Sequence, residues 1–345
     1  MVSSQTSRKM VKRCRVTLAE VASYDNLALA FYRAARGKRY RAEVQGFARH
    51  LDGELSRLQE DILSLQVAVG DYHTFHIWDP KPRQIHAPCF RERVLHHALI
   101  AQIGPALDRA LVDDSFACRA GKGTLAAVLR AQQHVRRFAW YGKVDVRSYF
   151  ASIEHDRLLA LLARKLKDRG VLALCERIVR SHHGDSGRGL PIGALTSQYF
   201  ANLYLGSMDR YLLGLPEVRG LVRYMDDTAF FCDSRLQARE TAEKATKFAR
   251  ERLGLSLHAD PRIQRSAFGL PFLGFRIRPG ALCLSRRRMR RYRKARRRWE
   301  GAYLAGKIDA LSLQAGYAAV YAVTAHAAAT RFRQQDLERR PSPDV

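Results

Sequence analysis

Arg223-Tyr224-Met225-Asp226-Asp227-Thr228 decides the fold, because it sets two adjacent carboxylates between two short apolar runs, Leu221-Val222 and Ala229-Phe230-Phe231. Both flanks are rich in strand-forming residues, so they can pair with each other across a turn. Adjacent residues on a strand point to opposite faces, so Asp226 and Asp227 can share one site only where a turn bends the chain. Aspartate also favours solvated turns. The hairpin alone is therefore equally consistent with a solvated turn and with a metal site.

A third carboxylate favours the metal site. The segment Tyr141–Val146 predicts another short strand, and Asp145 stands at its end. Alone, Asp145 is more typical of a strand end or a helix cap. Three aspartates at the ends of two neighbouring strands can hold two Mg²⁺ ions about 3.5–4 Å apart, which activates a 3′-hydroxyl and stabilises a leaving pyrophosphate. We therefore predict two Mg²⁺ ions as cofactor and the following catalytic and metal-site residues: Asp145, Asp226 and Asp227, with Val146 as a further metal-site residue.

Four segments, in this order along the chain, resemble motifs of the reverse transcriptases: Asp145–Asp156, Gly189–Gln198, Tyr224–Asp227 and Phe272–Phe275. The last of them resembles the primer grip, formed here by Phe272, Leu273 and Gly274. The resemblance implies an α/β right-hand polymerase with fingers, a palm of antiparallel sheet plus helices, and a helical thumb. The implied reaction is RNA-directed DNA synthesis.

The second of these motifs, Gly189–Gln198, indicates which group of reverse transcriptases the chain resembles most. Most reverse transcriptases carry Gln-Gly and then Ser-Pro in this loop, whereas this chain has Ile192-Gly193 and Ser197-Gln198. This pattern resembles the enzymes of diversity-generating retroelements, which copy a template-repeat RNA into cDNA with frequent errors opposite adenine, in mutagenic retrohoming. The resemblance implies template RNA, an RNA/cDNA duplex, dNTPs and a small basic accessory variability protein as partners.

Two alternatives remain open at this stage. The nearer is a retron, group II intron-like or phage-defence reverse transcriptase, against which the altered loop argues. The more distant is a noncatalytic RNA-binding protein with a polymerase fold, against which the set of three aspartates argues.

Further site residues follow from the resemblance. Phe150 stands five residues after Asp145, where this superfamily places an aromatic side chain that leaves no room for a ribose 2′-hydroxyl. Ile192 stands where a Gln can hydrogen-bond the incoming nucleotide, and an aliphatic side chain can only pack. For each residue, core packing or solvated surface charge is the alternative. The predicted nucleotide-binding residues are Lys81, Arg83, Arg119, Phe150, Ile192 and Gln198, and Arg91 and Lys122 are predicted to contact nucleic acid.

The charge of the chain indicates a polyanionic partner. Its 60 Lys and Arg residues against 33 Asp and Glu give a net charge of +27. From Arg276 to Trp299 the basic residues are interrupted by no acid, and aromatic and helix-forming residues lie among them. This pattern favours a helical thumb that grips the template–primer duplex over a solvated tail. The predicted contacts are Arg290, Arg291, Arg297 and Arg298.

The predicted division of the chain is a basic N-terminal segment (1–23), fingers (24–139), a palm with part of the fingers at about 160–190 (140–280), a thumb (281–336) and a frayed tail (337–345). No apolar stretch approaches the roughly 18 residues of a spanning helix, and the N-terminus lacks a signal-peptide core. We therefore expect a cytoplasmic protein, prokaryotic or phage-encoded, with no membrane partner.

Overall fold

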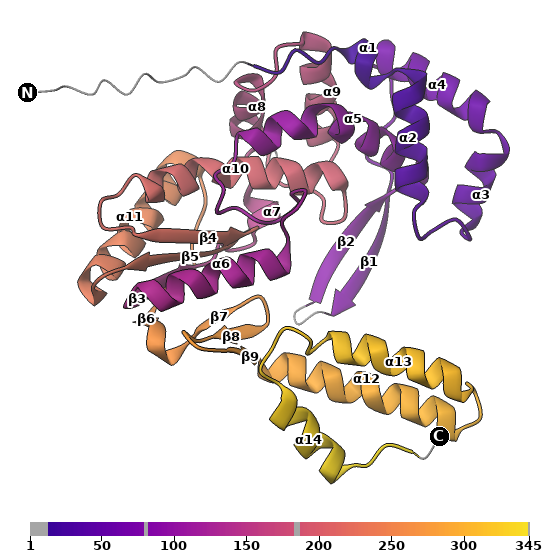
Figure 1. Ribbon diagram of the computed structural model, residues 1–345. Coiled ribbons are helices and arrows are strands. Elements are labelled where there is room, and N and C mark those ends of the chain that lie inside the picture. Colours follow the sequence, from indigo (N-terminus) through magenta and orange to yellow (C-terminus); the bar gives the residue numbers. More distant parts are fainter. Residues whose placement is uncertain (1–12, 79–81, 183–186, 344–345) are drawn as a thin grey trace, which may run out of the picture. The chain divides into compact units, whose positions relative to one another are not determined.

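The computed structural model describes residues 13–78, 82–182 and 187–343 (Figure 1). The chain forms two compact units, each assembled from separated segments. The first unit contains Met1–Asp113, Val146–Arg210 and Thr246–Leu257, and the second contains Asp114–Asp145, Tyr211–Ala245 and His258–Val345. Among the described residues, no helix combines the length and the apolar composition needed to cross a membrane.

The first unit is mostly helical. Phe31, Phe47 and Phe90 pack ring against ring at its N-terminal end, with centroids 5.3–5.9 Å apart. These rings join α2, α3 and α5, and α2 lies along α5. The elements here are α1 (Leu18–Val21), α2 (Tyr24–Ala35), α3 (Ala42–Arg49), α4 (Leu51–Leu63), the antiparallel strands β1 (Tyr72–Trp78) and β2 (Pro82–Pro88), and α5 (Phe90–Arg109).

Shorter helices complete the first unit. α8 packs against α9, and the Asp168 side chain caps α9 by accepting a hydrogen bond from the Val171 main chain at 2.8 Å. The elements are α7 (Tyr149–Ser152), α8 (His155–Ala163), α9 (Arg169–Arg180), and parts of α10 (Leu195–Leu213) and α11 (Arg235–Leu253), both of which continue into the second unit.

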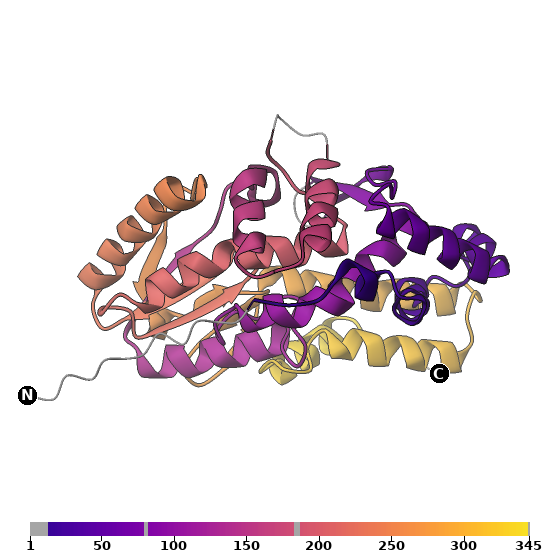
Figure 2. The ribbon, with the colours of Figure 1, turned by 90° about the horizontal axis from the view of Figure 1, so that it is seen from above.

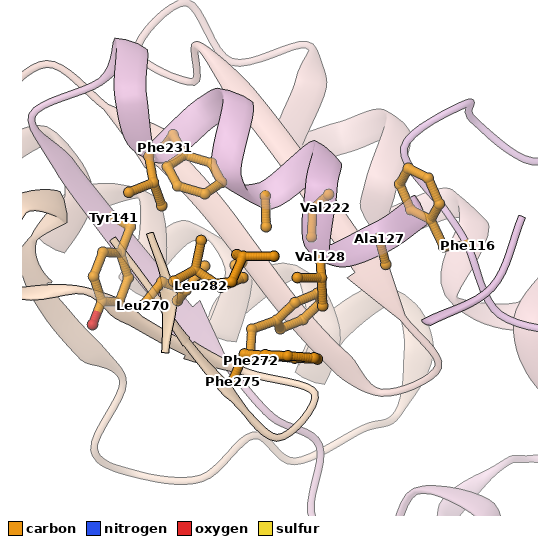
Figure 3. Close-up of a cluster of buried hydrophobic side chains, with 14 residues drawn as sticks. Phe116, Ala127, Val128, Tyr141, Val222, Phe231, Leu270, Phe272, Phe275 and Leu282 are labelled. Atoms are coloured by element: carbon orange, nitrogen blue, oxygen red, sulfur yellow. The ribbon is translucent and has the colours of Figure 1, made fainter. Parts of the chain in front are cut away.

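A four-stranded antiparallel sheet forms the centre of the second unit. Its strand order is β4 (Gly220–Tyr224), β5 (Asp227–Cys232), β3 (Trp140–Val144) and β6 (Arg262–Arg265). Helix α6 (Thr124–Arg137) packs against it, and the buried side chains of Val128, Val222 and Phe231 belong to one apolar cluster (Figure 3). The predicted α/β class with an antiparallel sheet is confirmed.

One predicted strand boundary needs correction. The strand expected to reach Val146 ends at Val144, so Asp145 comes directly after it. The segment from Asp114, including α6, belongs to the unit that contains the sheet. The reason is the apolar face of α6, which is buried against β4, β5 and β8 (Phe275–Ile277).

A small three-stranded sheet and three helices follow. The strands are β7 (Leu270–Phe272), β8 and β9 (Leu282–Leu284), after the short 3-10 turn Ser266–Phe268. Leu273 and Gly274 form the turn between β7 and β8, with φ of 47° and 82°. Positive φ at both positions is typical of a two-residue hairpin turn and explains the glycine. The helices are α12 (Arg286–Leu304), α13 (Ala310–Ala322) and α14 (Thr330–Arg339), and α12 and α13 run side by side (Figure 2).

Buried charges hold these three helices together. Arg296 of α12, with its side chain 3% exposed, donates to Glu300 Oε1 at 2.6 Å and to Asp336 Oδ2 of α14 at 3.1 Å. Tyr317 of α13 donates to Glu300 Oε1 at 3.0 Å. Arg296 also donates to the main-chain oxygen of Arg340. These contacts lie near the end of α14, which continues to Arg339.

Candidate active site

The two adjacent acids lie at one end of the four-stranded sheet. Tyr224 pairs with Asp227, so Met225 and Asp226 form a two-residue turn between β4 and β5. Val144 of β3 pairs with Thr228 of β5, so Asp145 and Asp227 are the next residues on adjacent antiparallel strands. The structure thus brings Asp145, Asp226 and Asp227 to the same end of the sheet.

A lysine lies against one of these acids. Lys143 Nζ is 3.0 Å from Asp227 Oδ2, whereas Asp227 Oδ1 is buried and has no hydrogen-bond partner in the described part of the chain. Burial raises the pKa of Asp227 to about 6; the negative charges of Asp145 and Asp226 add to the shift, and Lys143 opposes it. Asp227 is therefore in an environment that would accept a further cation.

The acids do not form a complete three-carboxylate site. Within residues 13–78, 82–182 and 187–343, no three carboxylate, histidine or cysteine side chains are arranged to hold a metal ion by themselves. Three nearby negative charges repel one another, and Lys143 neutralises one of them. Mg²⁺ is usually held by one or two carboxylates together with water and substrate phosphates. The unpartnered Asp227 oxygen and the oxygen-only donor set fit such an ion.

Lys143 was not singled out from the sequence. It stands two residues before Asp145 and so lies on the same face of β3, which is the signal that could have identified it. Its Nζ also donates to the Pro271 carbonyl at 3.2 Å and lies 6.0 Å from the centroid of the Phe272 ring. Lys143 therefore joins the acidic turn to the hairpin that carries Phe272, Leu273 and Gly274.

Arg119 and Lys122 lie in a loop beside β4. Ser115 pairs with Arg223 of β4 in an isolated bridge. Arg119 donates to the Ser115 carbonyl at 2.9 Å, and Lys122 Nζ lies 5.1 Å from the Phe116 ring centroid. Both predicted phosphate-binding residues thus belong to the unit that carries the acids, and the loop that holds them is attached to the strand before the acidic turn.

Three of the predicted nucleotide-binding residues lie on connected segments of the first unit. His86 of β2 donates from its main chain to the Ile192 carbonyl at 2.8 Å, and a Cβ on Gly193 would lie 2.9 Å from the His86 oxygen. Glycine therefore permits the close approach of this loop to β2, the strand of the exposed Arg83. Leu190 donates to the Phe150 carbonyl at 2.8 Å, which links the same loop to α7.

The other predicted residues of this unit have less specific surroundings. Phe150 is half-buried and packs edge-on against Tyr149, and Gln198 is half-buried in α10. Val146 is buried and pairs with Leu257. Arg91 donates to Asp61 at 2.8 Å, so its guanidinium is already in an ion pair within the first unit. Lys81 lies outside the described residues.

The basic run on α12 divides into two groups. Arg293 and Arg296 pair with Asp336, and Arg288 packs 4.0 Å above the Phe275 ring centroid. These side chains hold the C-terminal helices and β8 together. The predicted duplex contacts, in contrast, are all exposed and, at spacings of seven residues, lie on one side of the helix: Arg290, Arg291, Arg297 and Arg298.

Comparison with known proteins shows the family. The family model described as reverse transcriptase (RNA-dependent DNA polymerase) matches residues 79–277, which is more than half of the chain. The chain therefore belongs to the reverse transcriptase family. With the antiparallel sheet and its acidic turn, this membership confirms the predicted right-hand polymerase class.

Several curated proteins are similar over shorter segments. Protein YkfC of Escherichia coli is 23% identical over 46% of this chain and 45% of its own length. The group II intron-encoded protein LtrA of Lactococcus lactis is 22% identical over 39% of this chain and 24% of its own. A putative COX1/OXI3 intron 2 protein of Saccharomyces cerevisiae is 23% identical over 35% of this chain and 15% of its own length. The matches span less than half the length of each of these relatives.

Among solved structures, apo telomerase from Candida tropicalis, truncated from its C-terminal domain, aligns with a TM-score of 0.43 and 13% identity. The alignment covers 62% of this chain and 55% of that chain.

Proposed function

We propose that this chain is an RNA-directed DNA polymerase, which adds dNTPs to a 3′ end along an RNA template. The observation that supports this most strongly is the acidic turn in a member of the reverse transcriptase family. Asp227 presents a buried, unpartnered oxygen, and Asp145 and Asp226 lie at the same end of the sheet.

In this proposal each part of the site has a role. Asp145 and Asp226 are the main Mg²⁺ ligands, and Asp227 and Val146 complete the metal site. Bound Mg²⁺ would activate the 3′-hydroxyl and stabilise the pyrophosphate. The nucleotide would be held by Lys81, Arg83, Arg119 and Gln198, the primer end by Phe272, Leu273 and Gly274, and the template backbone by Arg91 and Lys122. Phe150 would exclude ribonucleotides by occupying the space of the 2′-hydroxyl.

Primer extension tests this proposal directly. The purified chain should extend a DNA primer on an RNA template with dNTPs and Mg²⁺, and rNTPs should be incorporated on the order of 100-fold more slowly, because the Phe150 ring leaves no room for the 2′-hydroxyl. Single-nucleotide incorporation, followed on denaturing gels with each nucleotide type, measures both properties. Extension that ignores an RNA template, or equal use of rNTPs and dNTPs, would contradict the assignment.

We further propose the diversity-generating retroelement as the biological setting. The support is the loop that carries Ile192-Gly193 and Ser197-Gln198. The template would then be a repeat RNA, copied with errors opposite adenine, and a small basic accessory protein would be the partner. A group II intron-like role is the second candidate, and it is supported by the similarity to intron-encoded proteins. A template repeat with an adenine-variant copy in the flanking DNA would favour the first, and intron boundaries the second.

Ile192→Gln should raise the fidelity of copying opposite adenine. The Ile192 carbonyl accepts the bond from His86 through the main chain, so the side chain can be changed while this loop keeps its contact with β2. A Gln amide would sense nascent-pair geometry through hydrogen bonds that a mispair satisfies poorly. We expect misincorporation to fall several-fold, on the order of 1 kcal/mol of added discrimination, even if total synthesis falls.

Sequencing cDNA made from one adenine-containing template by both enzymes, at equal dNTP concentrations, provides the measurement. Ile192→Leu is the matched control, since it keeps an aliphatic side chain and should keep the error rate. Equal or higher misincorporation by Ile192→Gln would assign error-prone copying to other residues or to the accessory partner.

A further inference from the structure

Arg223 is a fully buried arginine one residue before Tyr224 of the acidic turn. Its exposed fraction is 0%, and it is the largest of the fully buried side chains among the described residues. Burying an arginine is costly unless its donors are bonded. A side chain of this kind, so close to the proposed catalytic acids, calls for a specific role.

The main chain of Arg223 is fixed from both sides. On one side Arg223 pairs with Thr228 of β5. On the other, its N–H donates to the Asp114 carbonyl at 2.8 Å, and its carbonyl accepts from the Phe116 N–H at 2.9 Å. The guanidinium therefore extends from a fixed point on β4, the outer strand of the sheet, held between β5 and the segment Asp114–Phe116.

From this point the guanidinium reaches the acidic turn. Arg223 Nη1 donates to the Met225 carbonyl at 3.0 Å. Met225 has a φ of 56°, a backbone conformation that residues other than glycine rarely adopt. The φ of the neighbouring Asp226 is not positive. Strained residues of this kind persist where the surrounding structure holds them in place, and they gather at functional sites.

We infer that Arg223 is a positioning residue for the metal-binding acids. Its bond to the Met225 carbonyl keeps the strained turn closed, and the turn in turn fixes the directions of Asp226 and Asp227. Without the guanidinium, Met225 would relax toward negative φ and the two acids would lose their common orientation. This inference rests on the metal site of the proposed function.

Lysine and glycine substitutions test the coupling. Arg223→Lys keeps a positive charge but removes the planar donor fork. We expect it to weaken Mn²⁺ binding by the full chain, without template, on the order of tenfold, as loss of a residue that orients metal ligands does. Met225→Gly should restore most of that affinity in the Arg223→Lys background, because glycine adopts positive φ without strain. Titration followed by electron paramagnetic resonance of free Mn²⁺ gives each affinity.

The outcomes separate the alternatives. Unchanged Mn²⁺ affinity in Arg223→Lys, or a double variant as weak as the single one, would overturn the inference, because a general packing role would not be rescued at Met225. If Arg223→Lys does not fold, the double variant should recover folded protein, and its failure to do so would equally overturn the inference.

Asp226→Asn separates this inference from the function on which it rests. Because Asp226 is one of the two main ligands of the proposed metal site, Mn²⁺ binding should be lost in Asp226→Asn. Binding like that of the wild type would overturn the proposed metal site and this inference with it. Lost binding in Asp226→Asn, together with unaffected binding in Arg223→Lys, would overturn the role of Arg223 alone.

Discussion

Asp226→Ala and Asp145→Ala should each abolish Mg²⁺-dependent dNTP incorporation, with losses on the order of 1,000-fold or more. Both acids lie at the end of the sheet that carries the unpartnered Asp227 oxygen. Each substitution therefore removes one ligand of the proposed metal site. RNA binding should remain largely intact, because affinity comes from the basic surface and its contacts with phosphates. Primer extension and an RNA-binding titration on the same preparations measure the two properties.

Asp233→Ala is the matched control for these variants. Asp233 follows the opposite end of β5 and forms an exposed ion pair with Arg219 at 2.8 Å. Surface pairs of this kind contribute little stability. The control should therefore extend primers at the wild-type rate. Substantial cDNA synthesis by purified Asp226→Ala or Asp145→Ala would remove the basis of the proposed catalytic site.

Glu300→Ala should unfold or strongly loosen the three C-terminal helices. Glu300 is buried and accepts from Arg296 and from Tyr317, so its loss leaves a buried guanidinium only partly compensated and a hydroxyl without its acceptor. Breaking a buried ion pair by removing one partner costs about 3–5 kcal/mol. Domains are stable by only about 5–15 kcal/mol in total. Limited proteolysis of α12–α14, together with thermal unfolding, should show early cleavage and a lowered melting temperature.

Neutral replacements on the exposed side of α12 should weaken nucleic-acid binding and leave the stability of the protein unchanged. Glutamine at Arg290, Arg291, Arg297 and Arg298 should leave thermal unfolding close to that of the wild type, because these side chains are exposed. Template–primer binding should weaken. The slope of the logarithm of the binding constant against the logarithm of the salt concentration should become less steep by about 0.7–0.9 for each lost phosphate contact. An unchanged slope in the salt titration would exclude these four residues from the duplex interface.

For the buried pair, a Glu300→Ala protein as stable as the wild type would refute its structural role.

Local features of the sequence were enough for the acidic turn. Strand-forming residues on both sides of Asp226 and Asp227, and a second strand ending at Asp145, depend on alternation and turn preference, which act over a few residues. The end of the C-terminal helix depends on a distant residue, because Arg296, about 40 positions earlier in the chain, donates to the main-chain oxygen of Asp336 within α14 and to that of Arg340 just after it.

The sequence by itself determined the polymerase class, the acidic turn and the strongly basic C-terminal helix, because short motifs and local amino-acid composition specify each of them. Only the tertiary structure decided which charged residues have structural contacts. Arg296 and Arg297 are neighbours in one basic run, yet the first is buried between three helices and the second is exposed. Lys143 and Arg223 likewise gain their importance from strands and turns that pair across the sheet. Burial and partner choice depend on contacts between distant segments, and no pattern within a single run specifies them.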